Sequence, residues 1–261
     1  MHLRRVLSAT VILALLVPAR ASADVTLTQT IATSGGGHRT GQRTVISVKG
    51  LAMRVESTMG DERSATIYDV AAGRILRLDP KKREAESYDA AEVTASVEQR
   101  LPSERVTAEL TATGQSKELL GVSCEAYAFT IKAPIGRDSK ILFALTGTVW
   151  MAKSGEGVDD YLAFSRAADR SRLVIGDFRA KSATLVLVRG YTELLRRVAA
   201  LGAVPYAIDM AFKFDGTGKM VALGNKMASG TRVTTTTAVS VAPVSGELLT
   251  VPAGWKVKTP K

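Results

Sequence analysis

Apolar and polar residues alternate with a period of two through most of this 261-residue chain, and Gly, Pro and Asp residues divide the alternation into short segments. Successive side chains of a strand point to opposite faces, so the pattern predicts antiparallel strands with one buried face. Residues 34–41 are expected to form a loop, and residues 215–218 a turn. The expected strands are 25–33, 43–49, 53–57, 65–69, 74–78, 83–88, 106–113, 125–131, 141–151, 206–214 and 231–241.

The clearest alternation lies in residues 206–214. Five apolar side chains share one face of this expected strand: Tyr206, Ile208, Met210, Phe212 and Phe214. Aromatic rings and a flexible thioether suit an adaptable apolar cavity. These five residues are therefore the candidate ligand-binding face, and the alternative is that they form core beneath packed helices.

Three other segments repeat apolar residues at helical spacing. Residues 89–101 begin with Asp89, whose carboxylate can cap the first turn, and residues 158–170 and 191–201 each place apolar side chains on one face. Residues 173–188 fit neither period. The sequence thus predicts one helix within the strands and two more before the last strands.

The order of these segments predicts a mainly β (α+β) fold. A sheet with one apolar face must cover it, and amphipathic helices provide the cover. We expect a large curved antiparallel sheet or incomplete barrel with helices packed on the concave face. The expected organisation is a signal peptide at 1–23 and a single β-rich domain at 24–261, because no linker or fixed-period repeat divides the chain.

Residues 1–23 have the layout of a secretory signal peptide. Two arginines precede an apolar run at 6–17, an Ala-Ser-Ala sequence follows, and cleavage is expected between Ala23 and Asp24. The run is shorter than the about 20 residues that span a bilayer, although a retained anchor is the alternative. With no cysteine at the cleavage point for lipid attachment, the expected product is free, lacks a transmembrane segment, and is periplasmic or extracellular.

The charge of the chain is basic, with 35 Lys and Arg against 25 Asp and Glu. Without Arg4, Arg5 and Arg20 the counts are 32 and 25, which leaves a net charge of +7. Such an excess can favour anionic lipids, glycans or nucleic acid, or simply solubility. Nucleic acid is not expected as a partner, because only 5% of residues are aromatic and no basic block is interleaved with aromatic residues.

Cysteine and histidine are too scarce to build familiar catalytic or metal sites. Cys124 is the only cysteine, so an internal disulfide is excluded, and we expect a buried thiol, with a reactive or intermolecular thiol as the alternative. His38 is the only histidine after residue 23, and it has no neighbouring nucleophile. No catalytic residue, metal or cofactor is predicted. A carboxylate-dependent hydrolase stays open, because Asp and Glu are plentiful.

Five short segments, in their order and spacing, carry a resemblance to a known family. The segments are residues 74–82, 121–127, 148–153, 202–205 and 249–255. Over about residues 25–255 the chain resembles domain-of-unknown-function family 4412, a family of secreted bacterial proteins. Trp255 stands where that family usually has tyrosine, and the helical middle of this chain is longer.

The resemblance implies a fold similar to periplasmic lipoprotein-carrier proteins, in which an incomplete barrel around helices holds acyl chains. It implies no catalytic set. The first hypothesis is therefore an exported, non-enzymatic envelope protein that binds a lipid or other apolar ligand in a sheet/helix cavity. The alternatives are a structural or protein-interaction module with a filled core and, last, a carboxylate-dependent hydrolase.

Overall fold

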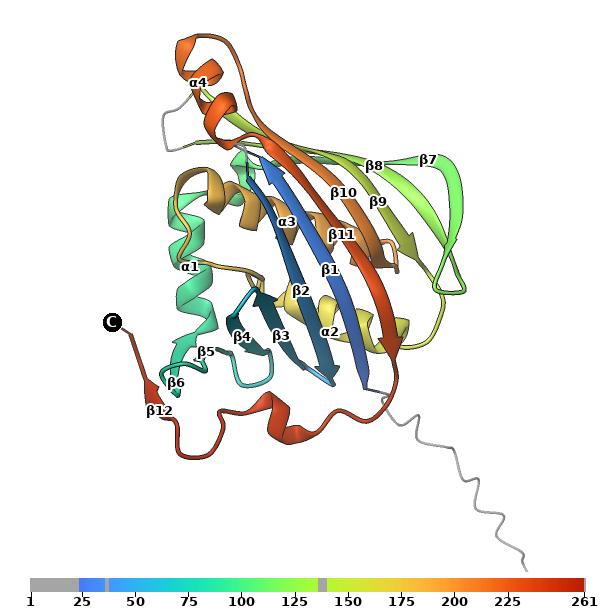
Figure 1. Cartoon of the computed structure of the whole chain (residues 1–261), viewed down its shortest axis with the longest axis vertical. Helices are drawn as coiled ribbons and strands as arrows, with labels where there is room; N and C mark the ends of the chain where they lie inside the picture. The colour runs from blue at the N-terminus through green and yellow to red at the C-terminus, as the bar shows by residue number, and fades with distance from the viewer. Residues whose placement is uncertain (1–23, 36–37, 136–139, 261) are drawn as a thin grey trace, which may run out of the picture.

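A computed structural model describes residues 24–35, 38–135 and 140–260. In these residues twelve strands form one sheet in the order β12-β6-β5-β4-β3-β2-β1-β11-β10-β9-β8-β7 (Figure 1). Neighbouring strands are antiparallel except β12, which pairs in parallel with β6. The strands are β1 Val25–Gly35, β2 His38–Lys49, β3 Ala52–Met59, β4 Glu62–Asp69, β5 Arg74–Asp79, β6 Glu84–Asp89, β7 Thr107–Leu119, β8 Val122–Pro134, β9 Leu142–Ala152, β10 Val204–Asp215, β11 Gly230–Ser240 and β12 Lys256–Lys258.

Tight turns join strands β2 to β6 into hairpins, as the sequence predicted, and a further tight turn joins β7 to β8. The β7–β8 turn consists of Leu120 and Gly121, both with positive φ (51° and 74°), which is the backbone of a type I′ hairpin. The first connection is shorter than expected. Strands β1 and β2 extend to Gly35 and His38, so the predicted loop at 34–41 is wrong for most of its length.

Four α-helices and two 3₁₀ segments complete the described residues. Asp89 caps the first helix, with its carboxylate accepting hydrogen bonds from the Ala91 and Glu92 N–H groups at 2.8 and 2.9 Å. No helix in the described ranges combines the length and the apolar character that crossing a bilayer requires. These elements are α1 Ala90–Arg100, η1 Ser103–Arg105, α2 Val158–Arg170, α3 Ser182–Ala200, α4 Lys219–Ala228 and η2 Gly246–Leu249.

The helices agree with the sequence in two cases and differ in two. The bounds of α2 are those predicted, and α1 differs by one residue at each end. Helix α3 starts at Ser182 instead of residue 191, so it absorbs the end of the unassigned segment 173–188. Helix α4 was not predicted: the glycine-rich turn at 215–218 leads into a helix before β11 begins.

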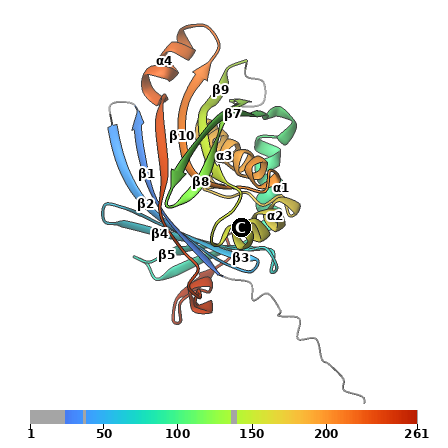
Figure 2. The same ribbon diagram turned by 90° about the vertical axis from the view of Figure 1, so that its right-hand side faces the viewer.

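Helices α1, α2 and α3 lie on one side of the sheet, inside its curve (Figures 1 and 2). The main core fills the space between them and the concave face, so the predicted α+β architecture is confirmed. Its largest fully buried side chains include Phe143, Phe164, Ile75, Ile131, Leu145, Met151 and Leu194.

A second, smaller core lies on the opposite face of the sheet. Ile67 and Tyr68 are neighbours on β4, yet Tyr68 belongs to the main core and Ile67 to the second. Val251 and Trp255 of the C-terminal segment pack against this second core. The segment therefore covers the back of the sheet before β12 adds to its edge.

Candidate functional site

The predicted binding face lies on the concave side of the sheet. It consists of the five alternating residues of β10: Tyr206, Ile208, Met210, Phe212 and Phe214. The first three are buried, and Phe212 and Phe214 are half-buried. The ring of Phe143 on β9 contacts both phenylalanines, with centroid distances of 6.2 and 5.1 Å. The predicted alternation is thus confirmed as one packed apolar surface.

Helix α3 lies directly over the neighbouring part of this surface. At Gly190 the helix comes so close to β9 that a Cβ atom would stand 2.5 Å from Cδ1 of Leu145. Leu145 and Leu194 have no more than 1% exposure. This part of the concave face is therefore filled core, and the assignment of the five β10 residues to ligand binding stays a prediction.

A guanidinium group interrupts the apolar surface. Arg232 on β11 pairs in register with Met210 on β10. Its Nε atom is buried without a hydrogen-bond partner, and the side chain forms no ion pair with any described carboxylate. Burial raises the pKa of the Tyr191 hydroxyl on α3, and the nearby positive charge of Arg232 partly offsets that rise. The sequence signal for the Arg232 side chain was that the expected strand at 231–241 has polar residues on both faces.

Polar side chains continue the concave face from β11 across β1, β2 and β3. Gln29 donates from Nε2 to Oγ1 of Thr236 at 3.3 Å, and both side chains are buried. Gln42 donates from Nε2 to Oγ of Ser57 at 2.8 Å and to Oγ1 of Thr44 at 3.3 Å. These groups satisfy one another, as buried polar groups generally do, so the unpartnered Nε of Arg232 stands out among them.

A cleft of about 460 Å³ lies within the helix layer, between α2, α3 and η1. Its floor is buried and apolar, with exposures of 1% for Phe164, 4% for Leu173 and 8% for Tyr161. The apolar lining residues are Val106, Tyr161, Phe164, Ala168, Leu173, Ile175 and Leu195. The polar lining residues are Glu98, Ser103, Glu104, Ser165, Asp169, Arg172, Arg189, Thr192, Glu193 and Arg196.

One ion pair fixes the η1 side of the cleft. Arg189 of α3, whose side chain is 12% exposed, bonds to the Glu98 carboxylate and to the Ser103 hydroxyl. Glu98 also accepts from the Ser103 N–H at 2.6 Å and from its hydroxyl at 2.8 Å. Burial raises the pKa of Glu98, but the Ser103 hydrogen bonds and Arg189 outweigh it and hold the pKa below its usual range. This wall is therefore charged and ordered at neutral pH.

A second cluster orders the α2–α3 side of the rim. Glu193 accepts from Arg196 at 2.7 and 2.8 Å and from Arg197 at 2.8 Å. Arg196 also lies 3.8 Å from the carboxylate of Asp169 on α2. In contrast, the exposed side chain of Arg172 has no ion-pair partner among the described residues. The rim thus offers one guanidinium group that the protein leaves free.

The connection between α2 and α3, which forms one end of the cleft, is held at several points. Arg100 of α1 donates to the Ala180 carbonyl at 2.8 Å and to the Phe178 carbonyl. The Gly176 N–H donates to the Tyr68 hydroxyl at 2.9 Å. Burial raises the pKa of Tyr68 to about 12, so it stays a neutral acceptor. Contacts from α1 and β4 therefore fix this connection.

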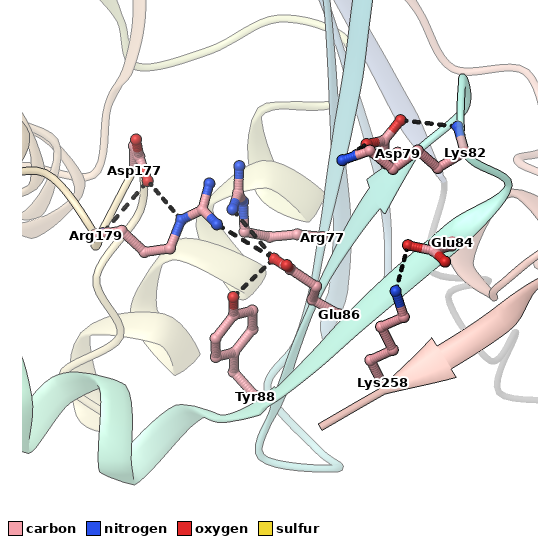
Figure 3. A network of polar contacts seen from close by, with 9 residues as sticks. All are labelled: Arg77, Asp79, Lys82, Glu84, Glu86, Tyr88, Asp177, Arg179 and Lys258. Atoms are coloured by element: carbon pink, nitrogen blue, oxygen red, sulfur yellow. Dashed lines mark hydrogen bonds and ion pairs between the residues drawn. The ribbon is translucent and has the colours of Figure 1, made fainter. Parts of the chain in front are cut away.

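Glu86 on β6 joins the same connection to the sheet (Figure 3). Its Oε2 accepts from the Tyr88 hydroxyl at 2.7 Å, from Arg77 at 3.3 Å and from Arg179 at 3.4 Å. Tyr88 packs edge-on against Phe178 with centroids 4.8 Å apart. Because one carboxylate bonds to two strands and the connection, we interpret this network as structural support for the cleft.

The structure describes part of what the sequence singled out elsewhere in the chain. No metal-binding group of three or more His, Cys, Asp or Glu side chains occurs in the described part of the chain. Cys124 is confirmed as a buried thiol, and burial raises its pKa. His38 starts β2, but its side chain is not among those described. The expected cleavage point has Ala23 outside the described residues and Asp24 within them.

Comparisons with known proteins give distant structural likeness only. No family model matches the chain, and no curated protein is significantly similar to it. A solved chain described as a "putative outer membrane lipoprotein-sorting protein domain from Vibrio parahaemolyticus" is 5% identical, with a TM-score of 0.34 over 88% of this chain and 90% of that one. A DUF1329 family protein from Desulfovibrio piger is 9% identical, with a TM-score of 0.24 over 88% of this chain and 91% of that one.

Proposed function

We propose that this protein is an exported, non-enzymatic envelope protein that binds one small amphiphile in the cleft between α2 and α3. The observation that carries the proposal is the form of the cleft: a volume of about 460 Å³, a buried apolar floor and an exposed charged rim. Small-molecule sites generally have volumes of about 300–1,000 Å³ and few polar groups at defined places. The apolar part of the ligand would cover Phe164 and Leu173.

Arg172 gives the rim one place where an acidic head group can bind. Arg189 and Arg196 are already paired with carboxylates, whereas Arg172 is exposed and free of a carboxylate among the described residues. A guanidinium group binds a carboxylate or phosphate through two parallel hydrogen bonds. We therefore propose a ligand with an apolar body and one anionic end, such as a long-chain fatty acid.

This proposal places the ligand in the helix layer, not in the sheet/helix space expected from the sequence. Helix α3 already fills the concave face at Gly190 and Leu145. The five β10 residues stay the alternative location. Membership of family 4412 also remains a proposal, based on the five sequence segments that resemble it.

The binding test compares a variant that fills the cleft with a matched control. Ser165→Trp places an indole in the cleft from α2, and Ser96→Trp places one on the exposed side of α1. A fluorescent long-chain fatty acid is titrated into each protein, and native mass spectrometry counts the bound molecules. We expect one molecule per wild-type chain and an affinity loss of at least about tenfold in Ser165→Trp only.

The head group is tested with a second pair of variants. Arg172→Gln should weaken binding of the fatty acid but not of the fatty alcohol of equal length, and Arg170→Gln, an exposed arginine outside the cleft lining, should change neither. Wild-type protein that takes up no amphiphile refutes the proposal. Binding that resists Ser165→Trp but falls in Phe212→Ala would move the ligand to the β10 face.

A second candidate is a structural or protein-interaction module with a filled core. The packing of α3 on β9 favours it, because that contact leaves no room for a Cβ atom at Gly190. This candidate predicts a clean mass without ligand and no uptake of any amphiphile. The titration above therefore separates the two functions.

A further inference from the structure

Helix α4 carries large apolar side chains that the fold does not bury. It projects beyond the rim of the sheet, between β10 and β11 in the chain (Figures 1 and 2). Met220, Leu223 and Met227 are 68%, 50% and 69% exposed. At about 100° per residue, these three side chains fall within an arc of about 60° on the helix. The exposed surface is thus one continuous apolar stripe.

The opposite side of α4 is fixed to the sheet. The Asn225 side-chain amide accepts from the Phe214 N–H at 2.8 Å and donates to the Phe214 carbonyl at 3.0 Å. It therefore satisfies both backbone groups of Phe214, as a neighbouring strand would. A Cβ atom on Gly224 would stand 3.0 Å from the Phe214 ring, and Val221 is only 6% exposed. The helix is therefore held with its apolar stripe outward.

The charged side chains of α4 are both positive. Lys219 and Lys226 are exposed, lie beside the stripe on the helix, and form no ion pair within the described part of the chain. The helix itself has no acidic residue. Asp215, the nearest acid along the described chain, is neutralised by Lys132 at 2.8 Å. The surface thus combines exposed apolar groups with unpaired cations.

This combination is the chemistry of a helix that lies in the interface of an anionic membrane. Protein-binding hot spots are instead enriched in Trp, Tyr and Arg, and α4 has none of these residues. We propose that α4 docks the protein on an anionic lipid surface, with Met220, Leu223 and Met227 among the head groups and the two lysines at the phosphates. The proposal does not rest on amphiphile binding in the cleft.

The test is sedimentation with vesicles. Every protein starts at Asp24, because residues 24–260 build the whole described sheet and core, and this removes the apolar run at 6–17, which would bind vesicles by itself. The wild type should sediment with vesicles of equal parts phosphatidylglycerol and phosphatidylcholine and much less with phosphatidylcholine alone. Binding should fall as salt is raised, because salt screens the lysines.

Two variants separate the apolar and charged contributions. Changing Met220, Leu223 and Met227 to Ser should reduce partitioning at least about tenfold, and Lys219→Gln with Lys226→Gln should reduce it about 25-fold, at about fivefold per lysine. The anchors Val221, Gly224 and Asn225 are unchanged, so circular dichroism and the melting temperature should match the wild type.

Matched controls come from other exposed positions. Leu120→Ser replaces a side chain with the same 50% exposure in the β7–β8 turn, and Lys81→Gln removes an exposed lysine far along the chain. Both should bind vesicles like the wild type. Wild-type protein that stays in the supernatant, or vesicle binding that survives the triple change, overturns the proposal and leaves α4 as a surface for a protein partner.

Discussion

Replacing Gly190 with alanine tests whether α3 rests directly on the sheet. Gly190 lies in the middle of the helix, where alanine is normally favoured over glycine by about 1 kcal/mol. In this protein the added Cβ would stand 2.5 Å from Cδ1 of Leu145 and 3.3 Å from Cγ2 of Ile131. Carbon atoms normally approach to about 3.5–4.0 Å. Helix propensity and packing therefore oppose each other at this position.

Packing should win. Leu145 has 0% exposure and Ile131 has 1%, so the displaced methyl group cannot move into solvent. Overpacking a tight core costs about 1–3 kcal/mol, and here the overlap exceeds about 1 Å, which puts the cost near the upper end of that range. Subtracting the favourable helix propensity of alanine leaves a net destabilisation of about 1–2 kcal/mol for Gly190→Ala. Each kcal/mol should lower the melting temperature by about 2–4 °C.

Urea denaturation of the wild type, Gly190→Ala, Leu145→Val and the double variant measures the effect. Valine at 145 removes the clashing Cδ1, so in that background Gly190→Ala should become neutral or stabilising. This reversal of sign excludes a general defect of the alanine variant. If Gly190→Ala stabilises the wild type by about 1 kcal/mol, then α3 does not touch β9, and the concave face is an open cavity.

Three further predictions concern single buried or half-buried side chains. Burial raises the pKa of Asp24, but hydrogen bonds from Lys49 and from the Val244 N–H outweigh it and lower the pKa. The carboxylate therefore stabilises the fold above about pH 4, and this stabilisation is lost as pH falls through the folded pKa. In urea melts at a series of pH values, Asp24→Asn should weaken the fall in stability at acid pH. Arg232→Leu should raise the unfolding free energy by about 1 kcal/mol, because a buried Nε without an acceptor is removed, and a loss of stability would reveal a partner. Cys124 should react with a thiol reagent only after unfolding, and fast labelling of the native protein would contradict its burial.

The spacing of apolar residues was sufficient to predict an element correctly where that element buries one face. Helix α2 has its predicted bounds, because all its apolar residues larger than alanine face the core and Ser171 and Arg172 end the pattern. Strand β10 alternates as predicted, because β9 pairs with it along its length and β11 pairs with its middle, from Ala207 to Phe212. In both cases local pattern and tertiary packing agree.

In helix α4 and the first half of α3, which were not predicted, local pattern and tertiary packing differ. Apart from Val221, the large apolar residues of α4 face solvent, so their spacing gave no sign of a helix packed on a core. The first half of α3 is rich in Val, Leu and Thr, which suit a strand as well as a helix. Its helical state depends on contact with β8 and β9, which the local sequence does not contain.

The cleft could not be predicted, because its residues come from five separate segments. Glu98 and Arg189 are 91 positions apart and meet only when α1 and α3 pack side by side. The two candidate surfaces also share no residue, since α4 contributes nothing to the cleft lining. A protein that carries an amphiphile to a membrane needs one site that holds the ligand and another that holds the surface. If both proposals are correct, variants of α4 should leave amphiphile affinity unchanged, and Ser165→Trp should leave vesicle binding unchanged. Coupling between the two would instead indicate that the helix layer moves when α4 docks.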